Sequence, residues 1–144
     1  AFMATVVLIF QALLLAHGGI TTLGANVFSM GIAGPWIGFW CWQLSNKLGW
    51  HRNVGMFLAL AFADLSTYVV TSVQLGLAFP DPVSGVVGSV AKFMGVFAIS
   101  QVPLAIAEGI LGVLVFRVLI DVAKHELERL GVIKPTVPVK EAVA

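Results

Sequence analysis

Two carboxylic residues lie deep inside apolar segments of the sequence, where an ionisable side chain is expensive. Asp64 stands in the apolar run 54–79, and Glu108 stands in the apolar run 86–119. On membrane-insertion scales a charged residue at the centre of a spanning helix costs about 2.5–3.5 kcal/mol, so such a residue faces a protein interior or a wet cavity. Each carboxylate is therefore a candidate for a role in a transport path, in conformational change or in docking.

Polar side chains continue from Asp64 along one helical face. Thr67, Thr71 and Gln74 follow 3, 7 and 10 residues after Asp64, which places all four on one side of a helix, with Tyr68 at its border. Two interpretations of this face stay open. It supplies hydrogen bonds between packed helices, as is common in membrane bundles, or it takes part in transport or in a conformational change.

A second stripe of polar and small residues surrounds Glu108. It runs Gln101, Ala105, Glu108, Gly112 at helical spacing. Lys92 is about 24 Å from Glu108 along a helix, too far for a pair on one element. A partner for Glu108 is therefore expected from another helix or subunit, and Glu108 is either a docking or coupling residue or a buried structural carboxyl.

One histidine heads a segment rich in glycine and polar residues. The segment 17–26 reads His-Gly-Gly-Ile-Thr-Thr-Leu-Gly-Ala-Asn, and an imidazole such as that of His17 can ligate a divalent transition metal. A single histidine does not make a site, and spacing alone favours a hydrogen-bonded loop residue. The sequence contains no H-E-x-x-H motif, P-loop or nucleophile elbow. We therefore expect no catalytic residue and no enzymatic or ATPase activity in this chain.

The elements that position these residues follow from the composition. Of 144 residues, 59% are hydrophobic and 10% are charged, whereas a soluble domain carries about 25% charged residues. No charged residue occurs between Ala1 and Asn46. The lone Cys41 excludes an internal disulfide and is expected in lipid or core contacts, and a net charge of +1 gives no field for nucleic acid. The sequence predicts an all-α, polytopic helical bundle in a lipid bilayer.

Four spans can be marked, and they do not alternate as barrel strands would. The first is short for a crossing and opens inside an apolar run, so we expect the chain to be a piece of a longer polypeptide whose front is missing. The last two exceed the minimum length and are expected to tilt, bend or protrude. The predicted spans are Ala1–Ala16, Ala25–Leu44, Val54–Phe79 and Val86–Leu119.

Basic residues predict the orientation of the spans. Lys47 and Arg52 lie in the second connection, and more basic residues follow the fourth span, whereas the segments 17–24 and 80–85 hold no Lys or Arg. The second connection and the C-terminus are therefore expected in the cytoplasm, with His51 and His125 on the opposite side from His17. The tryptophans predict an aromatic belt at the cytoplasmic end of the second span: Trp36, Trp40, Trp42 and Trp50.

Local signals refine this outline. Pro103 predicts a kink near Ile99. Small residues four apart predict close helix contacts at 12–16, 34–38 and 59–63. The chain divides into a membrane bundle, residues 1–119, and a cytoplasmic helix and tail, residues 120–144. In the tail we expect a helix from Asp121 to Arg129, with ion pairs 121–124 and 126–129, that stops near Gly131; the tail is either a solvated end or a contact with a partner subunit.

Three stretches of the sequence resemble a known family. They are FQALLLAHGGITTLGANVFSMG at 10–31, ADLSTYVVTS at 63–72, and the part from Lys92-Phe93 to PLAIAEG at 103–109. Together they resemble the CbiM/NikM family, the substrate-capture (S) subunits of energy-coupling-factor transporters for cobalt and nickel. The resemblance covers about Val6 to Leu119.

The resemblance implies a seven-helix bundle of which this chain supplies the last four helices, in a prokaryotic inner or plasma membrane. It implies a transmembrane coupling (T) subunit, two cytoplasmic ATPase subunits and a small accessory membrane subunit as partners. The substrate would be Co²⁺, imported for cobalamin biosynthesis, or Ni²⁺, and no covalently bound cofactor is implied.

The metal-binding motifs of that family are an N-terminal Met-His segment and a histidine in a Ser-His-Pro-Thr-Gly type loop. Neither motif occurs in this sequence. The chain is therefore expected to contribute the wall around a metal site rather than its ligands, through His17, Thr22 and Asn26.

Two further hypotheses remain beside a transporter subunit. The chain is instead a non-transporting membrane scaffold whose polar stripes bind neighbours, or, less favoured, an intramembrane enzyme, for which no nucleophile–base pair or metal-ligand pair accompanies the carboxylates. The candidates for intramembrane polar or coupling roles are Asp64, Thr67, Thr71, Gln101 and Glu108.

Overall fold

In a computed structural model, the described residues are 2–14 and 19–133, and helices dominate them. These residues contain no strand, only an isolated bridge between Asp81 and Gly85. The predicted all-α fold is confirmed. The elements are α1 (Phe2–Leu14), a 3₁₀ turn η1 (Ile20–Thr22), α2 (Leu23–Phe28), a π-helix η2 (Ser29–Ala33), α3 (Gly34–Lys47), α4 (Arg52–Ala78), α5 (Gly85–Val122) and α6 (Lys124–Arg129).

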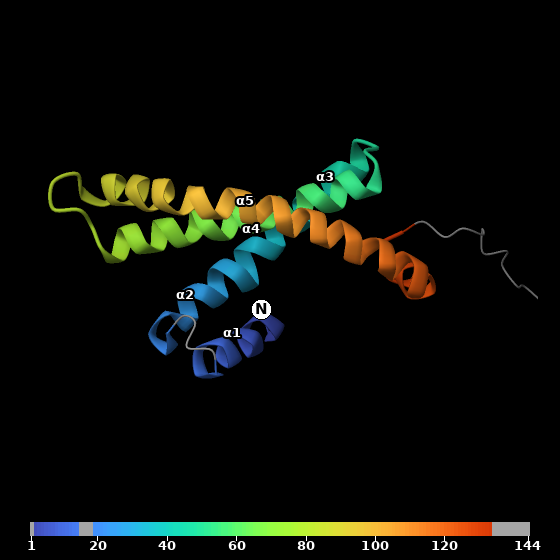
Figure 1. The fold of residues 1–144 in the computed structure, drawn as a ribbon, viewed down its shortest axis with the longest axis horizontal. Coiled ribbons are helices and arrows are strands. Elements are labelled where there is room, and N and C mark those ends of the chain that lie inside the picture. Colours follow the sequence, from blue (N-terminus) through green and yellow to red (C-terminus); the bar gives the residue numbers. More distant parts are fainter. Residues whose placement is uncertain (1, 15–18, 134–144) are drawn as a thin grey trace, which may run out of the picture.

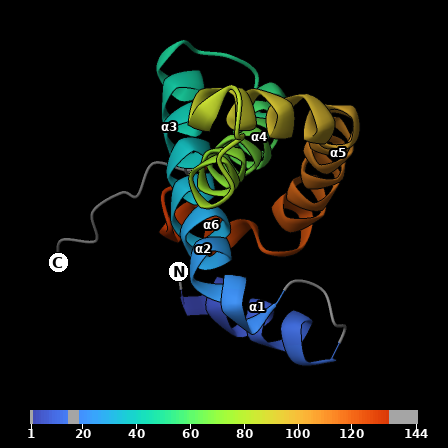
Figure 2. The same ribbon diagram turned by 90° about the vertical axis from the view of Figure 1, so that its left-hand side faces the viewer.

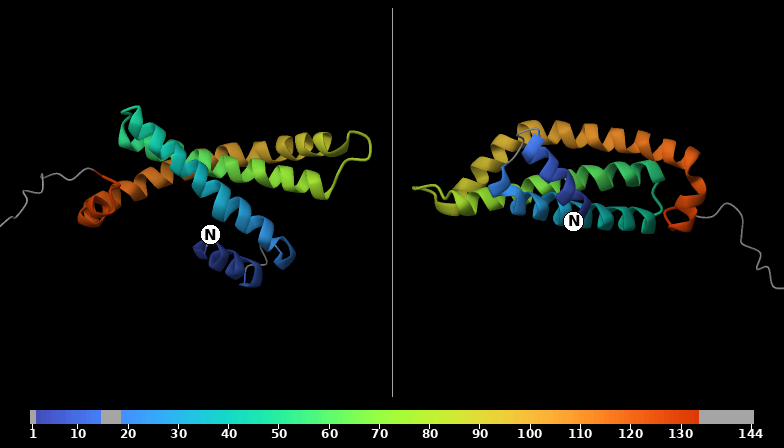
Figure 3. Two further views of the ribbon diagram at one scale, coloured as in Figure 1. Left: turned by 180° about the vertical axis from the view of Figure 1, so that it is seen from behind. Right: turned by 90° about the horizontal axis from the view of Figure 1, so that it is seen from below.

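Helix α4 is the centre of the arrangement. It pairs with α5 as an antiparallel hairpin, and α3 crosses it on another side (Figure 1). Among the described elements, α1 contacts only η1, α2 and η2 (Figure 3). The part of the bundle that surrounds the two carboxylates is therefore organised around α4.

Two of these helices are long and apolar enough to cross a membrane. They are Arg52–Ala78 with 27 residues and Gly85–Val122 with 38 residues. At 1.5 Å per residue they measure about 40 Å and about 57 Å, against about 30 Å for the hydrocarbon core. The predicted third and fourth spans are confirmed as helices, and α5 exceeds the bilayer core even when it is tilted.

The second span is longer than predicted, and it combines three types of helix instead of one continuous α-helix. Helical structure begins at Ile20 rather than Ala25 and continues to Lys47 through the 3₁₀, α and π segments. The connection expected at 17–24 is shorter because the Thr22 hydroxyl accepts a bond from the Gly19 amide at 3.1 Å and donates to the Gly19 carbonyl at 3.0 Å, which closes a turn. The π-helix accommodates an extra residue in its turn, a local feature that apolar periodicity does not reveal.

Small residues let α3 approach α4 closely, as their spacing predicted. A Cβ built on Gly38 would lie 3.0 Å from the Ala59 carbonyl oxygen and 3.1 Å from the Ala63 Cβ. The other side of α4 has similar contacts with α5, where a Cβ on Gly109 would lie 2.6 Å from the Phe57 ring. Glycine at these positions therefore sets the distances between the three helices.

Pro103 lies inside α5, and the first part of α5, drawn yellow, stands at an angle to the later orange part (Figure 2). The bend agrees with the kink that a proline produces when it removes a backbone donor.

The C-terminal helix differs from its prediction. Asp121 belongs to α5, which ends at Val122, and the chain breaks at Ala123 before α6. Glu126 and Arg129 form the expected ion pair at 3.5 Å, but within residues 19–133 no ion pair joins Asp121 and Lys124, because the break removes the helical spacing between them. Gly131 adopts φ +70° and donates to the Glu128 carbonyl, and Val132 donates to the Leu127 carbonyl, as in a Schellman motif.

The two ends of the bundle differ in charge. The α3–α4 connection and α6 lie at the end opposite the α4–α5 connection (Figure 1). The basic residues predicted to share one side therefore do so within the described part of the chain. Trp36 and Trp40 are 67% and 61% exposed, as a lipid-facing belt requires, whereas Trp42 packs edge-to-face on Phe116 at 5.8 Å.

The α4–α5 connection is held by one carboxylate. Asp81 accepts backbone bonds from Val83 at 3.0 Å and from Ser84 at 2.9 Å, and it pairs with the Lys92 ammonium. The Lys92 ammonium and these amides hold the pKa of Asp81 well below its usual range. The carboxylate thus stabilises the turn and the first part of α5 together.

Substituting Gly38 tests the close approach of α3 to α4. We expect Gly38→Ala to destabilise the protein by about 1–3 kcal/mol, because its Cβ meets a backbone oxygen that cannot move aside. Gly95→Ala is the matched control: nothing lies within 4 Å of a Cβ there, and alanine favours the helix. Unfolding in detergent measures both; equal stabilities of the two variants would contradict the packing.

The Asp81 turn predicts an unusual resistance to acid. Because the folded pKa is depressed, the stabilisation is complete above the ordinary Asp value of about 3.9 and is lost only as pH falls through the lower folded value. Corrected hydrogen-exchange protection of the Val83 and Ser84 amides should therefore be unchanged between pH 7 and pH 4. In the Lys92→Met variant, this protection should be lost at a higher pH, closer to pH 4. Loss of the protection at pH 4 in the unaltered protein would refute the role given to the Asp81 carboxylate.

Candidate functional site

The two predicted polar stripes meet in one cavity of about 360 Å³. Four parts of the fold line it: α1, the α2–η2 segment, α4 and α5. Its polar side chains belong to Gln11, Asn26, Ser29, Asp64, Thr67, Tyr68, Thr71, Gln101 and Glu108, and its apolar ones to Leu8, Met30, Phe97 and Leu104.

Helix α4 contributes Asp64 near its middle. The Thr67 hydroxyl donates to the Asp64 backbone carbonyl at 2.7 Å, so that hydroxyl is satisfied within its own helix. The carboxylate has no equivalent donor: its Oδ2 is buried and makes no hydrogen bond with any described residue. A buried polar atom without a hydrogen-bond partner costs free energy. Asp64 is therefore a residue for which a further donor or cation is expected.

Helix α5 contributes Gln101 and Glu108. Gly109 packs on Phe57 and fixes the height of α5 against α4. At this height Glu108 and Asp64 line the same cavity. The contacts that the small residues permit therefore bring two like charges to one cavity, rather than an acid and a base.

The π-helix directs residues into the same space. Ser29 is 1% exposed and Met30 follows it, and both line the cavity together with Asn26 of α2. The Ser29 hydroxyl donates to the Asn26 backbone carbonyl at 3.3 Å. Ser29 and Met30 follow Asn26 by three and four residues, so the three share one helical face at the point where the π-helix begins.

Tyr68 joins the cavity wall to α5. Its hydroxyl donates to the Met94 carbonyl at 2.7 Å, and its ring meets Phe97 edge-to-face at 6.5 Å. The bond is a direct polar link between α4 and α5 at the cavity wall.

The structure places the other predicted residues as follows. His17 lies outside the described residues. Thr22 is bonded to Gly19 and is not among the residues that line this cavity, whereas Asn26 is. Gln74 lies farther along α4 and donates to the Ala25 carbonyl at 3.3 Å, so it joins helices instead of facing the cavity.

Sequence reasoning missed Gln11, Ser29 and Met30 as lining residues. Gln11 and Thr5 are the two polar residues of the apolar helix α1, which is a usable signal. Ser29 and Met30 follow the predicted Asn26 by three and four residues, so helical spacing from Asn26 is the signal that could have found them.

The cavity is acidic and polar but is not a complete metal site. Within residues 2–14 and 19–133, no group of three or more His, Cys, Asp or Glu side chains is arranged to hold a metal ion. Carboxylate, amide and hydroxyl groups can still attract and orient a cation or a hydrogen-bond donor.

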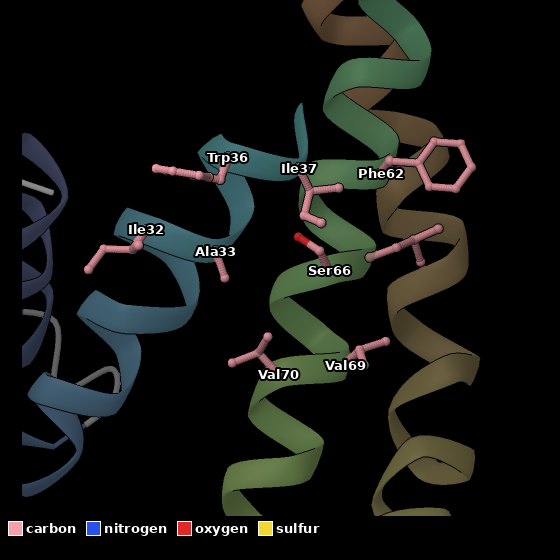
Figure 4. A pocket seen from close by; sticks show the side chains of 9 residues that line it. Ile32, Ala33, Trp36, Ile37, Phe62, Ser66, Val69 and Val70 are labelled. Carbon is pink, nitrogen blue, oxygen red and sulfur yellow. The ribbon is translucent and has the colours of Figure 1, made fainter. Parts of the chain in front are cut away.

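A larger hollow on another face has different chemistry. A groove of about 620 Å³ runs between the η2–α3 segment and α4, with Ile32, Trp36 and Ile37 on one wall and Val70 on the other (Figure 4). Its one hydroxyl, that of Ser66, donates to the Ala63 carbonyl of its own helix at 2.7 Å. The groove therefore suits acyl chains or apolar side chains, and the acidic cavity is the better candidate for polar chemistry.

Comparison with known proteins gives a consistent picture. A family model described as the cobalt uptake substrate-specific transmembrane region, CbiM, matches residues 1–126. The chain is 63% identical over 132 residues to a protein of Propionibacterium freudenreichii subsp. shermanii named cobalt transport protein CbiM, covering 92% of this chain and 56% of that protein.

Two other proteins with the same name show the same pattern. Identity is 56% to that of Streptomyces coelicolor, covering 92% of this chain and 57% of the relative. Identity to the protein of Salmonella typhimurium is 57%, and the match covers 81% of this chain and 47% of that relative. The chain thus spans about half the length of the curated relatives that it matches.

Tyr68→Phe tests the link between α4 and α5 at the cavity wall. Loss of the bond to Met94 should destabilise the protein by about 0.5–1.5 kcal/mol. Ser66→Ala is the control, because that hydroxyl bonds only within α4. Detergent unfolding should separate the two variants, and a Tyr68→Phe protein as stable as the control would show that the bond contributes nothing.

Proposed function

Because the chain belongs to the CbiM family of cobalt uptake substrate-specific transmembrane regions, we propose that it is part of the substrate-capture membrane subunit of an ATP-driven importer of Co²⁺ or Ni²⁺. The observation that carries the proposal is the match to the CbiM family model over residues 1–126. The relatives are transporter components by name, and the transported metal is a substrate rather than a resident cofactor.

Energy for transport comes from other chains in this proposal. The sequence has no P-loop, so ATP is bound and hydrolysed by two cytoplasmic ATPase subunits that act through a transmembrane coupling subunit. A small accessory membrane subunit completes the assembly. The chain captures metal from the outer side, and the partners drive its reorientation or the release of metal inward.

The same proposal fixes an orientation. The end with the α3–α4 connection and α6 carries Lys47, Arg52, Arg117, Lys124 and Arg129, which supports a cytoplasmic location for that end. The α4–α5 connection then faces outward, in a prokaryotic plasma membrane. The bundle lies in the bilayer to about residue 119, and the break at Ala123 marks where α6 leaves it.

The residues of this chain have distinct roles in this function. No metal cage forms among the described ones, so those do not provide the metal ligands by themselves. We assign His17, Thr22 and Asn26 to the wall around the metal site. Asp64 and Glu108, with Thr67, Thr71 and Gln101, serve the transport path or the coupling to partners, which their common cavity supports.

Selectivity between the two metals needs more than affinity. Nitrogen-rich ligand sets bind Ni²⁺ more tightly than Co²⁺ by the Irving–Williams order. An importer of cobalt must therefore rely on geometry and on metal supply, and the choice between the metals is a property of the whole subunit.

Metal uptake by the complete transporter tests the proposal. Cells that lack other importers should accumulate labelled Co²⁺ or Ni²⁺ only when the subunit containing this chain is present. The double variant Asp64→Asn/Glu108→Gln should lower uptake at least tenfold, whereas Glu126→Gln, on the exposed α6, should not change it.

The outcomes separate the alternatives. Uptake that is unchanged without the subunit would favour a scaffold that only binds neighbours. Normal uptake by the double variant would leave the family function in place but would eliminate the transport-path and coupling roles of the two carboxylates.

A further inference from the structure

The acidic cavity has no cation of its own within the described residues. Thirteen residues line it, and none of them is Lys, Arg or His. The basic residues of α5 have other partners: Lys92 pairs with Asp81, and the Arg117 guanidinium donates to the Asn53 amide oxygen, with Nη2–O at 2.7 Å. Arg117 also lies nine residues from Glu108, about 13.5 Å along the helix. The charge of the cavity is therefore not balanced from these helices.

Two features show that the imbalance is at membrane depth. Asp64 stands near the middle of α4, with its Oδ2 buried and without a hydrogen-bond partner. Glu108 is an exposed residue of α5 and lines the same cavity as Asp64. Two such carboxyl groups keep their charges in a bilayer only when a cation lies beside them or when water fills the space.

The rim of the cavity resembles a helix-packing surface. Leu8, Phe97 and Leu104 surround the polar groups, and α1 covers the cavity from one side only, because it contacts η1, α2 and η2 but not α5. Apolar side chains around a polar centre are more typical of a helix-packing interface than of a water-filled cavity.

We propose that a transmembrane helix carrying a Lys or Arg side chain occupies this cavity and neutralises Asp64 and Glu108. The helix belongs to the part of the full-length polypeptide that this chain does not include, since its relatives are nearly twice as long as the matched portion. A cation in the cavity stabilises the whole Asp64 carboxylate, whose charge both oxygens share. The side-chain amide oxygens of Gln11, Asn26 and Gln101 can accept hydrogen bonds from the remaining N–H groups of an ammonium or guanidinium.

This interaction is distinct from metal capture and holds for either metal. A metal ion is the competing occupant, but within the described residues the cavity offers two carboxylates and no third acidic, histidine or cysteine ligand. A fixed basic side chain needs no such set, because it needs only charge and hydrogen-bond acceptors.

Photo-crosslinking in the full-length transporter, in native membranes, identifies the occupant. A photoreactive residue replaces Gln101, which faces the cavity, or Ile99 on the same helix, which is 81% exposed. The Gln101 variant should give a crosslink within the same polypeptide, to a peptide with Lys or Arg within one helical turn, and the Ile99 variant should give lipid adducts. A crosslink to another subunit, to a second copy or to lipid at Gln101, or a peptide without a basic residue, would overturn the proposal.

A charge-exchange experiment tests the energetics in the full-length protein. Glu108→Gln should lower Tm by about 5 °C because it leaves the cation of the partner helix unpaired, and neutralising the identified basic residue in the same protein should restore part of the loss. Glu126→Gln is the control and should leave Tm unchanged. A rise in Tm for Glu108→Gln, or stabilisation by added Co²⁺ that Glu108→Gln abolishes, would instead indicate unpaired charges or a metal site. Neither readout depends on transport, so a failed uptake assay leaves this inference standing.

Discussion

The scarcity of water in the bilayer constrains how the polar groups within the described spans are satisfied. Backbone groups bond within helices, because no other open structure satisfies them in lipid. Hydroxyl groups follow the same rule: those of Ser66, Thr67 and Ser72 each donate to a carbonyl three or four residues earlier. A carboxylate cannot use this solution, since it only accepts hydrogen bonds and the carbonyls around it accept too. Asp64 and Glu108 are therefore different from the neighbouring residues that carry hydroxyl groups, including Thr67 of the same stripe as Asp64.

Close helix packing turns this local difference into a site. Gly38 brings α3 against Ala59 and Ala63, and Gly109 brings α5 against Phe57, so α4 is held on both sides. In a membrane, where burial of apolar area drives helix association weakly, such contacts determine which residues share a level. The glycines therefore place Glu108 beside Asp64, and larger residues at the same positions would shift the two carboxylates relative to each other.

The sequence predicted what depends on periodicity and missed what depends on local irregularity. Long apolar runs identified α4 and α5, and the spacing of Asp64, Thr67 and Thr71 identified a face that does line the cavity. The early start of the helix at Ile20, the π-helix and the break at Ala123 each depend on a few hydrogen bonds that hydrophobic pattern does not encode. Gln11 was missed for another reason: the face that α1 turns inward is decided by its contacts with α2 and η2.

The roles proposed for the chain extend from the outer end of the helices to the acidic cavity, and Asn26 belongs to both. In the proposed function, a metal ion taken from the outer side must exchange ligands with water, which favours capture near the end of the helices, where residues 19–26 lead into α2. Coupling to the partner subunits requires that helices move against one another, and the polar contacts that resist or permit such movement lie within the bilayer. Two carboxylates balanced by a cation from another helix are stable in the packing that holds the cation beside them. Any packing that separates the cation from the carboxylates is strongly unfavourable. The same constraint that makes Asp64 and Glu108 expensive thus makes them suitable for joining helix position to transport.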